Sequence, residues 1–342
     1  MSADTPVCQL LERQTTDYRG WLWVAPPRDR WLETGQGKLL SADEAVLAAW
    51  RARGQVAISP LSAELGGPEL GEAELAPPGA VLFWPKTHAL GEWWLLWLCA
   101  RLAPGTPLQV VGENQGGIRR VLKVLAALGL GCQRLDSARR CSLFGSTLDR
   151  VALEPDAAWK YFEVEGLTLA SHPGVFGHGK LDDGTRLLLE HLPAALPDTP
   201  PQGTEVLDMG CGDGIIAAWL ARRGHPVCAV DVNGFAVEAT RRTLAANGLS
   251  GEVLAGDVYS PLAGRRFAAI VSNPPFHQER RIDHGPASRL IREAPEHLKP
   301  GGMLLLVANA FLPWAEPLSR AFGDFEILAD DRRFRVYRAV RR

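Results

Sequence analysis

The sequence predicts an α/β protein made of two tandem domains. Short apolar runs alternate with helical segments along most of the chain, as in parallel sheets whose strands are joined by crossover helices. One of these runs is followed by a glycine-rich loop and then a helix. The chain has 342 residues, enough for two domains that each bury a core. We place the domains at residues 1–150 and 151–342, with the boundary near Leu148–Pro155.

In the first half, three strands alternate with three helices. The strands are expected at Gln55–Ser59, Ala80–Trp84 and Leu108–Gly112, and the helices at Ala42–Arg53, Glu92–Leu102 and Ile118–Leu128. This alternation favours a second α/β domain.

The second half gives a clearer pattern after a proline-rich stretch at Pro193 to Pro201. Strands are expected at Thr204–Asp208, Pro226–Val230, Glu252–Ala255, Ala268–Ser272 and Met303–Val307, with helices at Ile215–Arg223, Ala236–Asn247 and Ala287–Leu298. We expect these strands to form a parallel sheet covered by helices on both faces.

Composition limits the class of protein. The formal net charge is −2, so any contact with nucleic acid must come from local basic patches. The six cysteines form no CxxC pair, which predicts free thiols and no metal site. The most apolar stretch, Trp93 to Leu98, is far shorter than the roughly 20 residues of a membrane-spanning helix. The chain opens without a secretory signal pattern, so we expect a cytoplasmic protein.

The strongest local signal is the loop that includes Asp208, Gly210 and Gly212 and joins a strand to a helix. Its glycines let backbone amides approach a ligand at the helix N-terminus. NAD-binding domains use a similar device, but with G-x-G-x-x-G spacing. The G-x-G-x-G spacing and the preceding carboxylate favour S-adenosylmethionine as the cofactor.

Two further carboxylates follow the next two strands. Asp231 can accept hydrogen bonds from ribose hydroxyls, and Asp257 can accept one from an adenine amino group. Alternatively, Asp231 caps a helix and Asp257 belongs to a turn. Their order on successive strand ends favours cofactor binding.

The fourth strand of this half leads into Asn273-Pro274-Pro275-Phe276, which we take as the catalytic motif. An aromatic amine is a poor nucleophile because its lone pair is delocalised into the ring. The Asn273 side-chain oxygen and the Pro274 carbonyl can both accept from one NH2 group and aim its lone pair at a methyl donor. Phe276 can stack on the base. Pro275 holds the loop rigid, although a plain proline turn remains the structural alternative.

These motifs resemble the bacterial 16S rRNA (guanine-N2)-methyltransferases of the RsmC type, in the methyltransferase small-domain superfamily. The matching stretches span most of the chain: Val110–Asn114, Asp136–Cys141, Pro173–Phe176, Leu181–Thr185, Asp208–Gly214, Thr243–Gly248, Ser272–His277, Val307–Pro313 and Arg335–Ala339.

The resemblance implies two Rossmann-like class I methyltransferase domains, of which only the second binds S-adenosylmethionine. The first would be a degenerate copy that recognises RNA or supports the catalytic domain, since Trp84-Pro85-Lys86 stands where an active copy carries Asn-Pro-Pro. Phe176 would belong to a lid over the cofactor, together with Asp182–Thr185, or else be a core aromatic. The expected partner is 16S rRNA in the assembled 30S subunit, bound by a monomer without metal or membrane.

Alternatives remain open. The related 23S rRNA guanine-N2 methyltransferases share the N-P-P-F-H motif, and N-P-P-F also occurs in adenine-amine and protein glutamine methyltransferases. A non-catalytic RNA-binding or chaperone protein is the alternative of a different class. Arg280, Arg281, Arg289, Arg292, Arg139 and Arg140 are candidate phosphate contacts.

Overall fold

The structure is a computed structural model that describes the chain except residues 1, 36, 62–75, 153, 197–203 and 275–284. It divides into two compact units, Met1–Trp159 and Lys160–Arg342, so the division falls shortly after the predicted boundary. Every helix among the described residues is too short or too polar to cross a bilayer.

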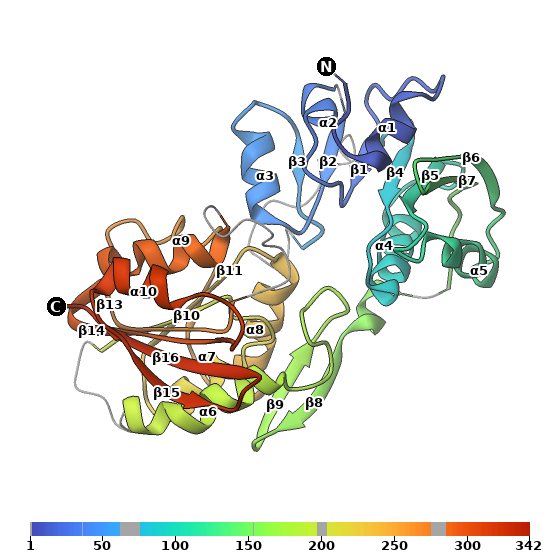
Figure 1. The fold of residues 1–342 in the computed structure, drawn as a ribbon. Helices are drawn as coiled ribbons and strands as arrows, with labels where there is room; N and C mark the ends of the chain where they lie inside the picture. The colour runs from blue at the N-terminus through green and yellow to red at the C-terminus, as the bar shows by residue number, and fades with distance from the viewer. Residues whose placement is uncertain (1, 36, 62–75, 153, 197–203, 275–284) are drawn as a thin grey trace. The chain divides into compact units, whose positions relative to one another are not determined.

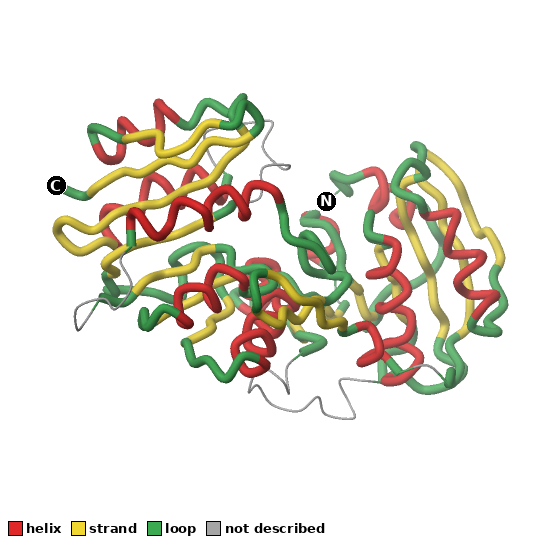
Figure 2. Tube along the Cα trace, turned by 90° about the horizontal axis from the view of Figure 1, so that it is seen from below, coloured by secondary structure: helices red, strands yellow, loops and turns green. Residues whose placement is uncertain are grey.

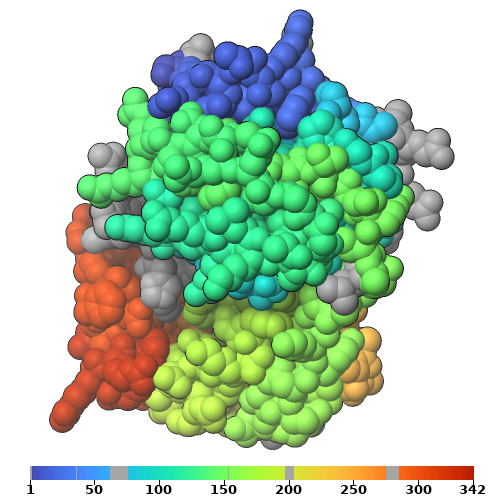
Figure 3. Space-filling view, turned by 90° about the vertical axis from the view of Figure 1, so that its right-hand side faces the viewer, coloured from blue at the N-terminus to red at the C-terminus, as the bar shows by residue number. Residues whose placement is uncertain are grey.

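The first unit combines seven strands with five α-helices in its described residues. In chain order these are α1 (Pro6–Glu12), β1 (Leu22–Val24), α2 (Arg30–Thr34), β2 (Lys38–Leu40), α3 (Glu44–Arg51), β3 (Ala57–Ile58), β4 (Ala80–Phe83), α4 (His88–Arg101), β5 (Pro107–Glu113), α5 (Val121–Ala127), β6 (Gln133–Ala138) and β7 (Cys141–Thr147). Two short 3-10 helices, Ile118–Arg120 and Pro155–Ala158, complete it. Coloured blue to green in the space-filling view, these residues pack into one body (Figure 3).

Tryptophans dominate the core of the first unit. Trp21, Trp23 and Trp50 are at most 8% exposed, and they pack with apolar residues of α1, α3 and the sheet. The Trp93-to-Leu98 run lies in α4, where Trp94 is almost fully buried. This run is therefore helix core, as the sequence predicts.

The second unit opens with a hairpin and continues as a larger α/β layer. Its elements are β8 (Lys160–Val164), β9 (Leu167–Ser171), α6 (Asp183–Ala195), β10 (Val206–Met209), α7 (Ile215–Arg222), β11 (Val227–Asp231), α8 (Gly234–Ala246), β12 (Glu252–Ala255), β13 (Phe267–Ser272), α9 (Pro286–Glu293), a 3-10 helix (Ala294–His297), β14 (Leu298–Asn309), α10 (Ala315–Phe322), β15 (Glu326–Asp330) and β16 (Phe334–Val340).

Helices cover both faces of the second sheet. Helices α9 and α10 contact each other and pack on one face over a large apolar cluster, whereas α6 lies on the opposite face (Figure 1). The strands form a twisted layer between these helices (Figure 2). The order is β12-β11-β10-β13-β14-β16-β15, with the first five strands parallel, as predicted.

The first unit repeats this topology. Its order, β3-β2-β1-β4-β5-β7-β6, is the same permutation, and in both sheets the last two strands of that order pair antiparallel with each other. The two units are therefore two copies of one Rossmann-like fold, which confirms the predicted fold class.

The sequence prediction missed several strands. Strands β1 and β2 have three residues each, too short to show a periodicity, and β15 and β16 form a C-terminal hairpin outside the strand–helix alternation. Of the proline-rich stretch, Pro193 lies inside α6, and residues 197–201 lie outside the described part of the chain. Five cysteines are buried, while Cys132 is partly exposed.

Helix α8 approaches the glycine loop so closely that Gly214 admits no side chain. A Cβ there would lie 2.8 Å from the Cα of Thr240, and the φ of Gly214 is +83°. At Gly224, the φ is +84° but a Cβ would meet no atom within 4 Å. Alanine at either position therefore has an unfavourable backbone conformation, because φ is positive at both. Only Gly214→Ala adds a clash with α8.

We expect Gly214→Ala to lower the free energy of unfolding by roughly 1–3 kcal/mol more than Gly224→Ala. Thermal unfolding followed by circular dichroism would measure both variants beside the wild type. Equal unfolding temperatures for the two variants would contradict the close approach of α8.

Candidate active site

Three strand ends come together at one edge of the second sheet. Met209 at the end of β10 pairs in register with Val230 of β11 and with Ser272 of β13. The Ser272 hydroxyl donates to the Met209 carbonyl at 2.7 Å and ties β13 to β10. The glycine loop, Asp231 and Asn273 therefore follow neighbouring strands and lie at one edge, as predicted.

The glycine loop leaves open space beside its backbone. Gly210 and Gly212 have φ of +77° and +56°, and a Cβ on either would meet no atom within 4 Å. The Gly210 amide donates to the Val230 carbonyl at 2.8 Å, and the Gly212 amide donates to Asp231 Oδ2 at 3.1 Å. The loop is thus fixed by β11 while its outer side stays clear for a ligand.

Asp208 lies beneath this loop rather than on its surface. Its side chain is fully buried, and Oδ2 accepts a hydrogen bond from the Ala217 amide of α7 at 2.9 Å. Oδ1 accepts no hydrogen bond from the residues that the structure describes. Burial, together with the charges of Asp231 and Asp213, raises the pKa of Asp208 to about 8.

Burial also raises the pKa of Asp213, to about 6. Three carboxylates thus lie close together around the glycine loop and the start of α7, those of Asp208, Asp213 and Asp231. This acidic cluster disfavours its own ionisation, and a cationic ligand would relieve that cost. The sequence identified two of its members but not Asp213, whose position inside the glycine loop was the available signal.

Asp231 holds the loop and the following turn together. In addition to the Gly212 amide, its carboxylate accepts from the Asn233 amide at 2.9 Å. Asn233 is itself the N-cap of α8. The helix-cap alternative for Asp231 is therefore wrong.

Asp257 forms an ion pair with Arg289 of α9. The backbone amide of Asp257 donates to the Ser260 hydroxyl at 2.9 Å, so Asp257 also belongs to a turn. Asp257 and Arg289 both line a cavity of about 1050 Å³. A role for Asp257 at an adenine amino group stays a prediction, and Arg289 has a carboxylate partner rather than a free guanidinium.

Phe176 lies on the surface, 63% exposed, so the alternative of a core aromatic is wrong. The turn before it is anchored near the cofactor loop: the Asn233 side chain donates to the Gly174 carbonyl at 2.7 Å. The Gly174 amide donates to His172 Nδ1 at 3.1 Å, and His172 stacks on Phe235 of α8. The turn before Phe176 is thus held against the residues that follow β11, and the Phe176 ring itself is exposed.

Asn273 directly follows β13 and is partly buried. Its Nδ2 donates to Asp182 Oδ2 at 2.9 Å and to Thr185 Oγ1 at 2.8 Å. None of the described residues donates to its Oδ1. Pro274 is buried behind it, whereas Pro275, Phe276, Arg280 and Arg281 lie outside the described residues.

The first unit lacks these groups at the matching strand ends. Strand β1 leads into Ala25-Pro26-Pro27, with no glycine, and β4 leads into the buried Trp84, whose indole is only a donor. The expected strand Gln55–Ser59 contains the edge strand β3, so the place equivalent to the glycine loop is the loop after β1.

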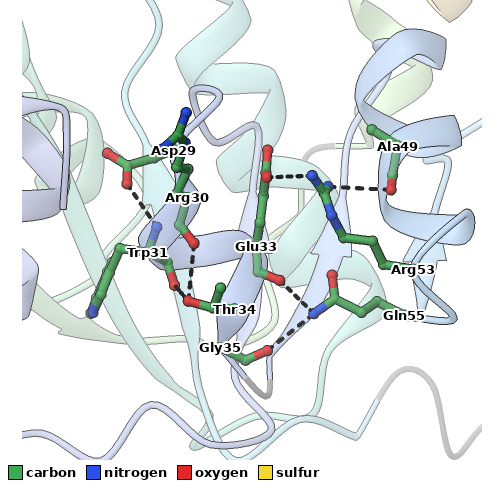
Figure 4. Close-up of polar contacts among 9 residues, drawn as sticks. All are labelled: Asp29, Arg30, Trp31, Glu33, Thr34, Gly35, Ala49, Arg53 and Gln55. Atoms are coloured by element: carbon green, nitrogen blue, oxygen red, sulfur yellow. Dashed lines mark hydrogen bonds and ion pairs between the residues drawn. The ribbon is translucent and has the colours of Figure 1, made fainter. Parts of the chain in front are cut away.

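The Asp29 carboxylate, which follows β1, is hydrogen-bonded within the first unit. Asp29 accepts hydrogen bonds from the amides of Asp4, Thr5 and Trp31. Beyond it, α2 is tied to its neighbours by a 2.7 Å ion pair between Glu33 and Arg53 and by Gln55, which donates to backbone carbonyls (Figure 4). These contacts are structural.

Comparisons with known proteins agree with this geometry. Residues 166–338 match the model of the methyltransferase small domain, and residues 9–162 match that of its N-terminal domain. The chain is 64% identical over 341 residues to ribosomal RNA small subunit methyltransferase C of Chromohalobacter salexigens, covering 100% of this chain and 99% of that protein. It is 46% identical to the protein of that name from Stutzerimonas stutzeri, covering 78% and 82%.

A solved structure matches both units. It is the T. thermophilus 16S rRNA N2 methyltransferase RsmC in complex with AdoMet and guanosine, with a TM-score of 0.85 and 28% identity. The match covers 99% of this chain and 92% of that one. Topology, strand-end chemistry and full-length similarity agree, and the chain belongs to the ribosomal RNA small subunit methyltransferase C family.

Proposed function

We propose that this protein transfers a methyl group from S-adenosylmethionine to the exocyclic N2 amine of a guanine in 16S rRNA. The substrate is the assembled 30S subunit, and the enzyme acts in the cytoplasm as a monomer that needs no metal. The observation that carries the proposal is the Asn273 carboxamide, held by its nitrogen with its oxygen left to accept, at the sheet edge that also carries the glycine loop.

The residues at the glycine loop suit S-adenosylmethionine. Its ammonium and sulfonium groups are cationic, and the loop stands over three clustered carboxylates, one with an acceptor oxygen that lacks a described partner. Asp231, at the end of β11, is placed for ribose hydroxyls. When bound, the cofactor supplies an electrophilic methyl group on sulfur.

Asn273 prepares the nucleophile. Its Oδ1 and the Pro274 carbonyl accept hydrogen bonds from the substrate amine, which directs the nitrogen lone pair at the methyl carbon. A nitrogen–carbon bond forms as the carbon–sulfur bond breaks, leaving S-adenosylhomocysteine, and the extra amine proton passes to water. The chain therefore contributes position and hydrogen-bond acceptors rather than a general base.

The names of the relatives favour the small subunit. They are named ribosomal RNA small subunit methyltransferases, and the matched solved structure is that of a 16S rRNA N2 methyltransferase with bound guanosine. This favours 16S rRNA over the 23S rRNA alternative. The first unit would then recognise or support RNA binding. Arg139 and Arg140 support this role, because they are exposed in the tight β6–β7 turn with φ of 52° and 60°.

The proposal is tested with radiolabelled S-adenosylmethionine and purified 30S and 50S subunits that lack their native guanine methylations, followed by nucleoside analysis. Label in N2-methylguanine from 30S alone is expected. Label from 50S alone would assign the protein to the 23S rRNA reaction, and no label from either would contradict the proposed substrate.

Asn273→Ala removes the acceptor and should lower the rate of methyl transfer roughly 100- to 1000-fold, as loss of a transition-state hydrogen bond does. Binding of 30S subunits should be retained. Single-turnover transfer and filter binding measure the two effects, with Asn114→Ala in the first unit as the control. Full transfer by Asn273→Ala would rule out this mechanism and favour another acceptor.

Asp208→Asn tests the buried carboxylate. Since the pKa of Asp208 is raised to about 8, its protonated form contributes stability that is complete below about pH 4 and is lost as the pH rises through about 8. Asparagine resembles the protonated acid at every pH. The variant should therefore match the wild type in thermal unfolding near pH 4 and exceed it by a margin that grows with pH, reaching several degrees near pH 9.

The same variant should bind S-adenosylmethionine more weakly, because it removes negative charge beside a cationic ligand. Isothermal calorimetry near pH 8.5 measures this. The account would be contradicted if Asp208→Asn bound S-adenosylmethionine as tightly as the wild type. It would also be contradicted if unfolding of the two proteins depended on pH in the same way.

A further inference from the structure

The catalytic carboxamide is held by a segment that the proposed reaction does not yet use. Asp182 and Thr185 lie at the start of α6, far from Asn273 in sequence, and both accept from Asn273 Nδ2. The segment Asp182–Thr185 is expected in a lid over the cofactor, and two of its residues also contact the side chain that is proposed to receive the substrate amine.

We propose that Asp182, assisted by Thr185, is a positioning residue that fixes which end of the Asn273 carboxamide faces the substrate. This inference rests on the proposed function. A carboxamide has a donor end and an acceptor end of nearly equal size, and rotation by half a turn about its last bond exchanges them. Only the acceptor end can receive a hydrogen bond from an amine.

The chemistry of Asp182 decides the orientation. An ionised carboxylate only accepts hydrogen bonds, so it pairs with Nδ2 and repels Oδ1. The 2.9 Å contact to Asp182 Oδ2 therefore stabilises the arrangement in which Oδ1 points away from Asp182. The Thr185 hydroxyl oxygen takes the second Nδ2 proton at 2.8 Å, so both donors of the amide are used inside the protein.

The support is built rigidly. Asp182 is the N-cap of α6, and its Oδ2 also accepts from the Thr185 amide at 3.2 Å. Thr185 is only 6% exposed, so its hydroxyl has little freedom to leave. The N-terminus of the 13-residue helix α6 thus holds the Asn273 side chain in one orientation at the sheet edge.

Asp182→Asn isolates the positioning role from the capping role. Asparagine caps helices about as well as aspartate, so helix α6 should be retained. Its own carboxamide, however, can offer either a donor or an acceptor, and it no longer selects one orientation of Asn273. We expect the single-turnover rate of methyl transfer to 30S subunits to fall about 10- to 100-fold. Affinity for S-adenosylmethionine and the unfolding temperature should stay at wild-type values.

Two controls sharpen the comparison. Glu190→Gln removes an exposed carboxylate further along the same helix α6, outside the Asp182–Thr185 segment, and should leave the rate within about twofold. Thr185→Val removes the hydroxyl acceptor and should also slow transfer, whereas Thr185→Ser restores the acceptor and most of the rate.

A second measurement does not depend on activity. The side-chain amide signal of Asn273, identified in nitrogen–proton spectra by its loss in Asn273→Ala, should shift in Asp182→Asn and stay in place in Glu190→Gln. A shift together with the selective fall in rate supports the inference.

A wild-type transfer rate in Asp182→Asn overturns the positioning role while leaving the proposed function intact. The positioning role is also overturned if the Asn273 signal does not move, or if the rate falls only in proportion to a lower unfolding temperature. Failure of the wild type itself to methylate 30S subunits would instead contradict the proposed function, and the spectra would still report whether Asp182 orients Asn273.

Discussion

The candidate site of the second unit depends on the parallel register of β10, β11 and β13. Parallel neighbours end at one edge of a sheet, so residues that follow them in sequence are brought together without any long-range contact of their own. Met209 sets this register, because it pairs with both neighbouring strands and accepts the Ser272 hydroxyl. The glycine loop and Asn273 then become neighbours.

The first unit shares this architecture but carries different residues at the matching strand ends. It has the same strand order, yet its strand ends carry Pro26, Pro27 and a buried Trp84, and its Asp29 accepts from backbone amides at the starts of α1 and α2. The glycine loop of the second unit has open space beside its backbone, whereas the first unit has no glycine at that place. The two units thus share a packing pattern, while the polar groups at their strand ends differ.

The sequence predicted the features that depend on local pattern. Buried strands of four to seven residues, amphipathic helices and the motifs at Gly210 and Asn273 are each readable within a short window. The three-residue strands β1 and β2 could not be recognised, since pairing with neighbours rather than periodicity defines them. The bonds from Asp182 and Thr185 to Asn273 were equally out of reach, because about ninety residues separate the partners and only the fold joins them. The burial of Asp208 beneath its loop likewise follows from packing against α7.

The central claim is that two copies of one fold provide a single cofactor site, at the carboxyl edge of the second sheet. The most direct measurement is the stoichiometry of S-adenosylmethionine binding to the full-length protein by isothermal calorimetry, repeated with Asp231→Ala. The account predicts one molecule per chain and loss of that binding in the variant. Two molecules per chain, or one that persists with unchanged affinity in Asp231→Ala, would contradict it.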